Sequence, residues 1–135
     1  MADKRTQSER YAEIGAELIR TEPSLDKVKQ SEATICYLSS TAAPVSKGRA
    51  KLGECERVPE KWKWAVPADF TVTVFEPNCE GLDDEQLRAL VHHELLHVGI
   101  GEDKDGNETH SIVGHDIDEF RAVADLYGLD WSERR

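Results

Sequence analysis

One stretch decides the fold that we predict: LDDEQLRALVHHELLHVGIG, residues 82–101. Its leucines and valines recur three and four residues apart, which is the spacing of one face of an α-helix. Asp83 can cap the start of that helix, and the acidic residues that follow it suit the positive end of the helix dipole. Gly99 and Gly101 are typical of a helix end. We therefore predict a helix over about residues 83–98.

The segments around this helix predict a small sheet and further helices. Residues 70–75 (FTVTVF) form the strongest predicted strand, because they are β-branched or aromatic and alternate along the chain. Other strands are predicted at residues 33–38 and, with a bulge at Gly53, at residues 49–58. Other helices are predicted at residues 8–20, capped by Ser8, at residues 24–32 and at residues 116–127. The predicted fold class is α+β, with a mainly antiparallel sheet of about three strands and helices on one side.

The composition favours one acidic, soluble domain. A chain of 135 residues has room for one hydrophobic core, so we predict a single domain over residues 1–135 with flexible ends at 1–7 and 130–135. The formal net charge of −10 gives no basic face for phosphates, so we expect no nucleic-acid partner. No apolar run is long enough for a membrane span, and no secretory signal is visible. The three cysteines form no CxxC pair, which favours reduced thiols in the cytoplasm.

The predicted helix contains an HExxH motif at residues 93–97. Residues four apart share one helix face, so His93 and His97 can direct imidazole nitrogens to one Zn²⁺ ion. Glu94 then lies beside the metal and can take a proton from a metal-bound water. A chain of this composition would contain only about 0.02 such motifs by chance. His92 points away from His93 by about 100°, so we expect it on the helix surface or beside the ligands.

A catalytic zinc site needs a third protein ligand and an open position. His115 is the ligand we favour, because a chain that leaves the metal helix at residues 99–101 can return there at the start of the final predicted helix. Glu119 lies one helical turn further and is the main alternative. Asp116 and His110 are further candidates.

The motifs together resemble those of minimal zincin metalloproteases. The SprT-like and Spartan group combines an HExxH helix with a later Gly-His segment that ends in Glu-Phe, as at residues 114–120. The chain is more similar still to the putative phage metallopeptidase family. That family combines an Ala-Asp-Phe strand, as at residues 68–70, with an HHEL-type metal helix and a His-Asp-x-x-Glu-Phe segment. The resemblance covers about residues 33–127.

The resemblance implies a role for several residues. It implies that His115 is the third ligand. The SprT-like segment has its glutamate three residues after the histidine, whereas Glu119 lies four residues after His115, so the role of that glutamate does not carry over. The resemblance also implies that residues 70–75 form an edge strand, the alternative being an ordinary inner strand. We predict that Trp62 and Trp64 pack on the core, the alternative being a place in a substrate cleft.

The sequence thus predicts a zinc-dependent metallopeptidase with one zinc ion per chain. His93, His97 and His115 would bind the metal, and Glu94 would act as general base and pass the proton to the leaving amine. The predicted partner is a peptide or protein substrate, met in the host cytoplasm if the chain is phage-encoded. One alternative is a non-catalytic zinc-binding interaction module, although that would not need Glu94. Another is a metal-dependent hydrolase of a non-peptide bond.

Overall fold

The computed structural model describes residues 3–115, 121–128 and 131–132, and it has an α+β fold. Four strands form one mixed sheet in the order β1 (Arg5–Gln7), β2 (Ile35–Ser40), β6 (Phe70–Phe75) and β5 (Gly53–Arg57). Two hairpins accompany the sheet: β3 (Val45–Ser46) with β4 (Arg49–Ala50), and β7 (Val98–Glu102) with β8 (Glu108–Ile112). The core lies between the sheet and the helices.

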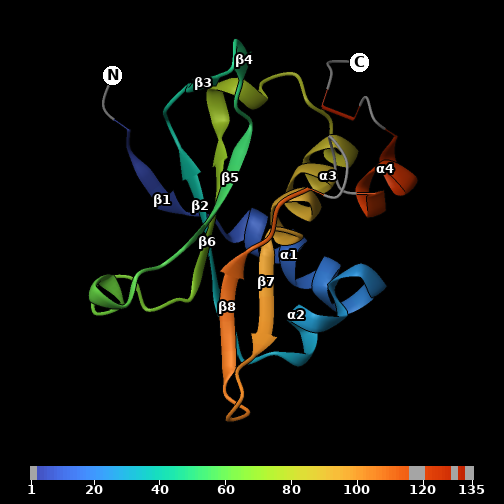
Figure 1. Ribbon diagram of the computed structural model, residues 1–135. Helices are drawn as coiled ribbons and strands as arrows, with labels where there is room; N and C mark the ends of the chain where they lie inside the picture. Colours follow the sequence, from blue (N-terminus) through green and yellow to red (C-terminus); the bar gives the residue numbers. More distant parts are fainter. Residues whose placement is uncertain (1–2, 116–120, 129–130, 133–135) are drawn as a thin grey trace.

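The helices gather on one side of the sheet, to the right in Figure 1. They are α1 (Glu9–Thr21), α2 (Asp26–Gln30), α3 (Asp84–Leu95) and α4 (Arg121–Tyr127), with single 3₁₀ turns at Pro23–Leu25, Glu60–Trp62 and Glu76–Cys79. Helix α1 packs on β2, while α3 packs on β5 and β6. Residues 116–120, the first part of the last predicted helix, lie outside the described residues. No described helix is long and apolar enough to span a membrane.

Strand β6 has the predicted bounds, but it lies inside the sheet. Phe70 pairs in parallel with Ile35 of β2 and antiparallel with Arg57 of β5. The expectation that residues 70–75 form an edge strand is therefore wrong. Four residues of this strand are fully buried, at 0% exposure: Phe70, Val72, Thr73 and Val74. A strand so thoroughly buried has no free edge, and β5 is the edge strand on this side of the sheet.

The sheet has four strands, not the predicted three, because residues 5–7 add β1 at the other edge. We predicted a flexible end here, since these polar residues have no apolar pattern. Instead β1 pairs antiparallel with β2. The Arg5 guanidinium donates to the Glu54 carboxylate at 3.0 Å and to the Thr73 hydroxyl at 3.2 Å across the sheet. Backbone pairing and ion pairs, rather than apolar burial, thus hold this strand.

Helix α3 begins where we predicted but ends at Leu95, earlier than the predicted end at residue 98. The chain then enters the β7–β8 hairpin, where we predicted a helix end and a polar loop. Gly99 does not cap a helix. A Cβ atom there would lie 2.4 Å from Oγ of Ser111 and 2.8 Å from its carbonyl oxygen, so glycine permits the close approach of β7 and β8. Gly106, with φ of 84°, forms the turn between them.

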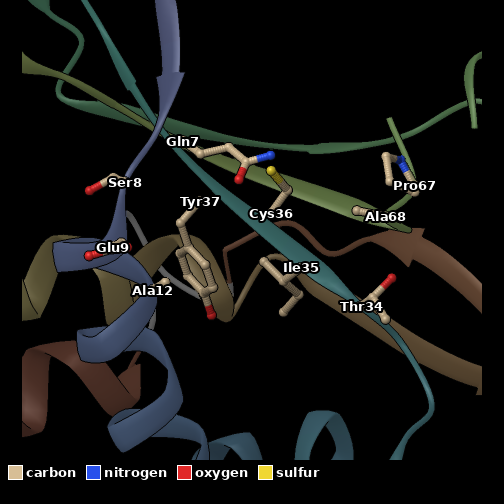
Figure 2. Close-up of a pocket in the computed structure, with 10 residues that line it drawn as sticks. All are labelled: Gln7, Ser8, Glu9, Ala12, Thr34, Ile35, Cys36, Tyr37, Pro67 and Ala68. Atoms are coloured by element: carbon tan, nitrogen blue, oxygen red, sulfur yellow. The ribbon is translucent and has the colours of Figure 1, made fainter. Parts of the chain in front are cut away.

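Helix α1 approaches the sheet closely at Gly15. A Cβ atom at this position would lie 2.2–2.5 Å from the Tyr37 ring, so only glycine fits. Figure 2 shows Tyr37 reaching from β2 toward Ala12 of α1, whereas Gln7 and Cys36 lie together on the other face of the strand. A cavity of about 290 Å³ opens beside this strand and extends to Pro67 and Ala68.

The tryptophans also differ from the prediction. Trp62 and Trp64 are 49% and 80% exposed, so the expectation that they pack on the core is wrong. The loop that carries them projects from the end of β5, at the left of Figure 1. Trp131 lies within residues 130–135, the end that we predicted to be flexible, but it is buried at 4% exposure.

Candidate metal centre

The N-terminal end of α3 is fixed by a capping box. The Asp83 carboxylate accepts the Gln86 backbone N–H at 2.8 Å, and the Gln86 side chain accepts the Asp83 N–H at 2.9 Å. Two orphan N–H groups are thereby satisfied. The buried Gln86 side-chain amide also donates to the Trp131 carbonyl at 2.8 Å. The helix that presents the candidate site is thus anchored at its start to the far end of the chain.

The last turn of α3 carries His93 and Glu94, while His97 lies two residues beyond the helix end. The chain keeps turning after Leu95, because the Leu96 N–H donates to the His92 carbonyl and the His97 N–H donates to the Glu94 carbonyl, both at 3.1 Å. His97 consequently stays about one turn from His93. Their ring centroids lie 5.1 Å apart.

The segment that follows β8 returns to this turn and brings His115 with it. The Val113 N–H donates to the His97 carbonyl at 2.7 Å. The His97 Nδ1 lies 2.6 Å from the Val113 carbonyl oxygen. Because a carbonyl only accepts, Nδ1 must carry the proton, which leaves the lone pair of Nε2 available to a metal.

The structure brings His93, His97 and His115 to one point. The His115 Nε2 lies 3.1 Å from the His93 Nε2 and 3.2 Å from the His97 Nε2, and one ligand atom from each residue lies within 4.8 Å of the others. With Zn–N bonds of about 2.0–2.1 Å, two nitrogens of a tetrahedral site lie about 3.3–3.4 Å apart. The observed spacing therefore fits a small cation. His115 is exposed, so the point of convergence reaches the surface.

Glu94 lies beside this cluster and against the sheet. Its side chain is only 6% exposed, and its Oε2 lies 4.0 Å from the His93 Nε2. A Cβ atom at Gly53 of β5 would come within 3.4 Å of the same oxygen. Burial and the nearby Glu94 charge raise the pKa of the Cys55 thiol on β5 to about 12. The carboxylate therefore lies between the histidine cluster and the edge strand.

His110, one of the further candidates, does not join the cluster. Its Nε2 lies 2.7 Å from the Glu108 carboxylate, and its ring packs on Phe70 at a centroid distance of 5.4 Å. Asp116 and Glu119, the two remaining candidates for the third ligand, lie outside the described residues. His115 is therefore the candidate that the described chain brings to His93 and His97.

His92 is fully buried at 0% exposure, rather than on the helix surface. Its Nε2 lies 2.8 Å from the Ser24 hydroxyl, and its Nδ1 lies 3.3 Å from the Tyr127 hydroxyl. These contacts join α3 to the turn before α2 and to α4. His92 thus connects the elements around the cluster.

Sequence reasoning missed three features that shape the site. The first is the Val113 backbone, which orients His97, and the second is Gly53, where a Cβ atom would lie 2.9 Å from the Thr73 carbonyl oxygen, so glycine lets β5 lie close beside Glu94. The third is Trp131, whose ring lies 5.8 Å from the His93 ring. Of these three features, only Gly53 had a signal in the sequence. An isolated glycine within a predicted strand marks either a bulge or a close approach of another part of the backbone.

A family model described as Putative phage metallopeptidase matches residues 3–134. No curated protein and no solved structure matches the chain significantly. The matched range includes β1 and Trp131. It therefore extends at both ends beyond residues 33–127, over which the motifs alone resemble the family.

Proposed function

The chain belongs to the putative phage metallopeptidase family, and on that premise we propose that it is a zinc-dependent peptidase with His93, His97 and His115 as metal ligands and Glu94 as general base. The family supports a metallopeptidase at the coarse level. The choice of zinc, the ligand set and the role of Glu94 are our proposal. They rest on the geometry of the cluster.

One observation carries the proposal: three imidazole nitrogens converge at a surface point beside a buried carboxylate. Among the described residues the cluster holds three histidines and no fourth ligand, which would leave one position of a tetrahedral ion open, as catalytic zinc sites require. A structural site usually has all four positions filled by protein. The exposure of His115 leaves room for water and substrate at this point.

Zinc held there would polarise the substrate carbonyl and lower the pKa of a water molecule toward about 7. Glu94 would take the proton of the attacking water, a role supported by its buried carboxylate 4.0 Å from the His93 Nε2. The same carboxyl group can then deliver that proton to the leaving amine. The Val113 carbonyl keeps the proton of His97 on Nδ1, which preserves the tautomer that binds metal.

A peptide substrate is supported by the edge of the sheet next to Glu94. In the described part of the chain, β5 pairs with β6 alone. An edge strand offers N–H and C=O groups to which an extended peptide can add. Because Gly53 lies beside Glu94, a peptide that pairs with β5 would pass the carboxylate. This arrangement favours a peptide bond over a small non-peptide substrate.

The proposal is tested by adding zinc to the purified protein and following cleavage of denatured casein by mass spectrometry. We expect about one zinc per chain and new peptides that a chelator prevents. Zinc binding without cleavage of casein or of a broad peptide library would favour a non-catalytic zinc-binding module. Failure to bind zinc would overturn the proposal.

A further inference from the structure

The loop between β5 and β6 presents two tryptophans to solvent. We call residues 58–68 the tryptophan loop. Trp62 and Trp64 are 49% and 80% exposed, and their ring centroids lie 6.5 Å apart. Large aromatic side chains are costly to leave in water, and paired exposed ones are typical of binding surfaces.

The tryptophan loop has an ordered backbone. Its first residue, Val58, donates its N–H to the Asp69 carbonyl at 2.8 Å. The N–H groups of Ala65 and Val66 both donate to the Trp62 carbonyl, at 3.0 and 2.9 Å. The Lys63 ammonium donates to the Asp69 carboxylate at 3.0 Å and ties the loop to the start of β6. Little conformational entropy would therefore be lost when a partner binds to the rings.

Residues 57–64 carry three basic side chains, Arg57, Lys61 and Lys63, and one acidic side chain, Glu60, which gives a local formal charge of +2. The chain has a formal net charge of −10. Within the described residues, neither Arg57 nor Lys61 makes an ion pair, and the Lys61 ammonium lies 5.8 Å from the centre of the Trp62 ring. An acidic segment would be repelled by most of this surface but attracted here.

The tryptophan loop continues directly from the strand that passes Glu94. Gly53, at the start of β5, lies beside the Glu94 carboxylate, while Arg57 ends the strand at the loop. Four residues of strand span about 13 Å at about 3.3 Å per residue. A peptide paired with the outer edge of β5 would therefore reach the tryptophans at least about four residues from the bond next to Glu94.

We propose that the tryptophan loop binds an extended segment of the protein substrate, one that carries an aromatic or large apolar residue flanked by acidic residues, at least about four residues from the cleaved bond. This inference rests on the proposed peptidase function. It names the substrate class as long, unfolded polypeptide rather than short peptide. Trp62 and Trp64 would supply the apolar contact, and Arg57 and Lys61 the charge.

Binding is measured separately from cleavage, with the full-length Glu94→Gln protein loaded with zinc. The probes are fluorescein-labelled, unstructured 20-residue peptides with Glu-Phe-Glu near either end, compared with Glu-Ala-Glu and Lys-Phe-Lys versions. The test variant is Trp62→Ala/Trp64→Ala. The matched control is Val45→Ala, because Val45 is 70% exposed on β3, away from the loop. Fluorescence anisotropy gives the affinities, and circular dichroism checks that each variant is folded.

We expect the Glu-Phe-Glu peptide to bind tightest. The double variant should weaken its binding by about tenfold or more, because buried tryptophans carry much of the energy of an interface. Val45→Ala should change nothing. Equal affinities for all three peptides, or equal affinities of the double variant and the parent, would overturn the inference. Tryptophan-dependent binding to phosphatidylglycerol vesicles without any peptide preference would also overturn it, in favour of a lipid surface.

Cleavage by the chain with Glu94 intact separates this inference from the proposed function. The double variant should cut six-residue peptides as fast as the parent but should have a raised KM for the 20-residue peptides. Unchanged KM for both lengths would refute the loop's role while the peptidase stands. If no peptide is cut but the tryptophan-dependent preference remains, the proposed activity fails and the binding surface survives.

Discussion

The carbonyl oxygen of Val113 lies 2.6 Å from the His97 Nδ1, and the Val113 N–H donates to the His97 carbonyl at 2.7 Å. One residue after β8 thus holds His97 through both its backbone and its ring. Because His115 follows only two residues later, the same contact brings the third histidine to the cluster. The position of β8 relative to β7 therefore determines the geometry of the candidate metal site.

Gly99→Ala tests this dependence. The new Cβ would lie 2.4 Å from Oγ of Ser111 and 2.8 Å from its carbonyl oxygen, so β8 would have to move. We expect a loss of about 1–3 kcal/mol in the free energy of unfolding and weaker zinc binding, both measured on the purified variant. Gly114→Ala is the matched control, because a Cβ there would meet nothing within 4 Å although it adjoins His115. Equal zinc affinity for the two variants would contradict the argument.

His115→Ala tests the third ligand. Residues that only orient a ligand already change metal affinity by about 10–100-fold, so loss of a ligand should weaken zinc binding by more than about 100-fold. His110→Ala should retain zinc, because His110 contacts Glu108 and Phe70 instead of the cluster. Isothermal titration with zinc compares the two variants. Full retention by His115→Ala would move the assignment to a residue such as Glu119.

Trp131→Ala and Trp64→Ala should differ strongly in their effects on stability. Trp131 is 4% exposed and contacts the His93 ring, so its removal should cost about 3–5 kcal/mol of unfolding free energy. Trp64 is 80% exposed, so its removal should change that energy by less than about 0.5 kcal/mol. Urea unfolding measures both. Similar costs for the two would show that the C-terminal residue is not part of the core.

The Asp69 carboxylate should make the protein less stable in acid. Burial opposes its ionisation, but the Thr34 N–H and the Lys63 ammonium outweigh that effect and hold its pKa below the usual value. A lowered pKa stabilises the fold above the unfolded-state pKa of about 3.9, and that stabilisation is lost as the pH falls below it.

Asp69→Asn should therefore cost about 1–2 kcal/mol of unfolding free energy at pH 7 and much less at pH 3. Asp105→Asn serves as the control, because Asp105 is exposed in the β7–β8 turn and its carboxylate forms no ion pair with a described residue. Urea unfolding at the two pH values measures the effect. A cost for Asp69→Asn that is equal at both pH values would show that the ionised carboxylate is not what stabilises this contact.

Local patterns predicted the elements whose determinants are near in sequence. The alternation of FTVTVF placed β6 with its observed bounds, and Asp83 with Gln86 explains the start of α3. The spacing of His93 and His97 predicted their proximity even though the helix ends between them. His115 was favoured because the chain can return from residues 99–101 to the start of the last predicted helix, and the family resemblance implied the same ligand.

The β7–β8 hairpin was missed because Gly99 and Gly101 are ambiguous. Either glycine can end a helix, but in the structure they let two strands approach. The alternation of Val98 and Ile100 with these glycines, together with the turn at Gly106, was the contrary signal. Local sequence could not decide between the two, because the deciding contact is with Ser111.

Local sequence also failed to predict which tryptophans are buried. Residue type predicts burial, yet Trp64 is exposed and Trp131 is buried. Trp131 is held by the Gln86 side chain, 45 residues earlier in the sequence. Such long-range contacts are set by the folded chain as a whole and leave no local pattern.

Hydrolysis of denatured casein by the zinc-loaded chain and by its Glu94→Gln variant tests the central claim most directly. Glutamine keeps the shape of the side chain but cannot take the proton, so the variant should bind zinc and unfold like the parent. Its cleavage rate should fall by at least about 10²–10⁴-fold, the usual contribution of a general base. Cleavage by both proteins at the same rate would contradict the claim that Glu94 is the base of a zinc peptidase.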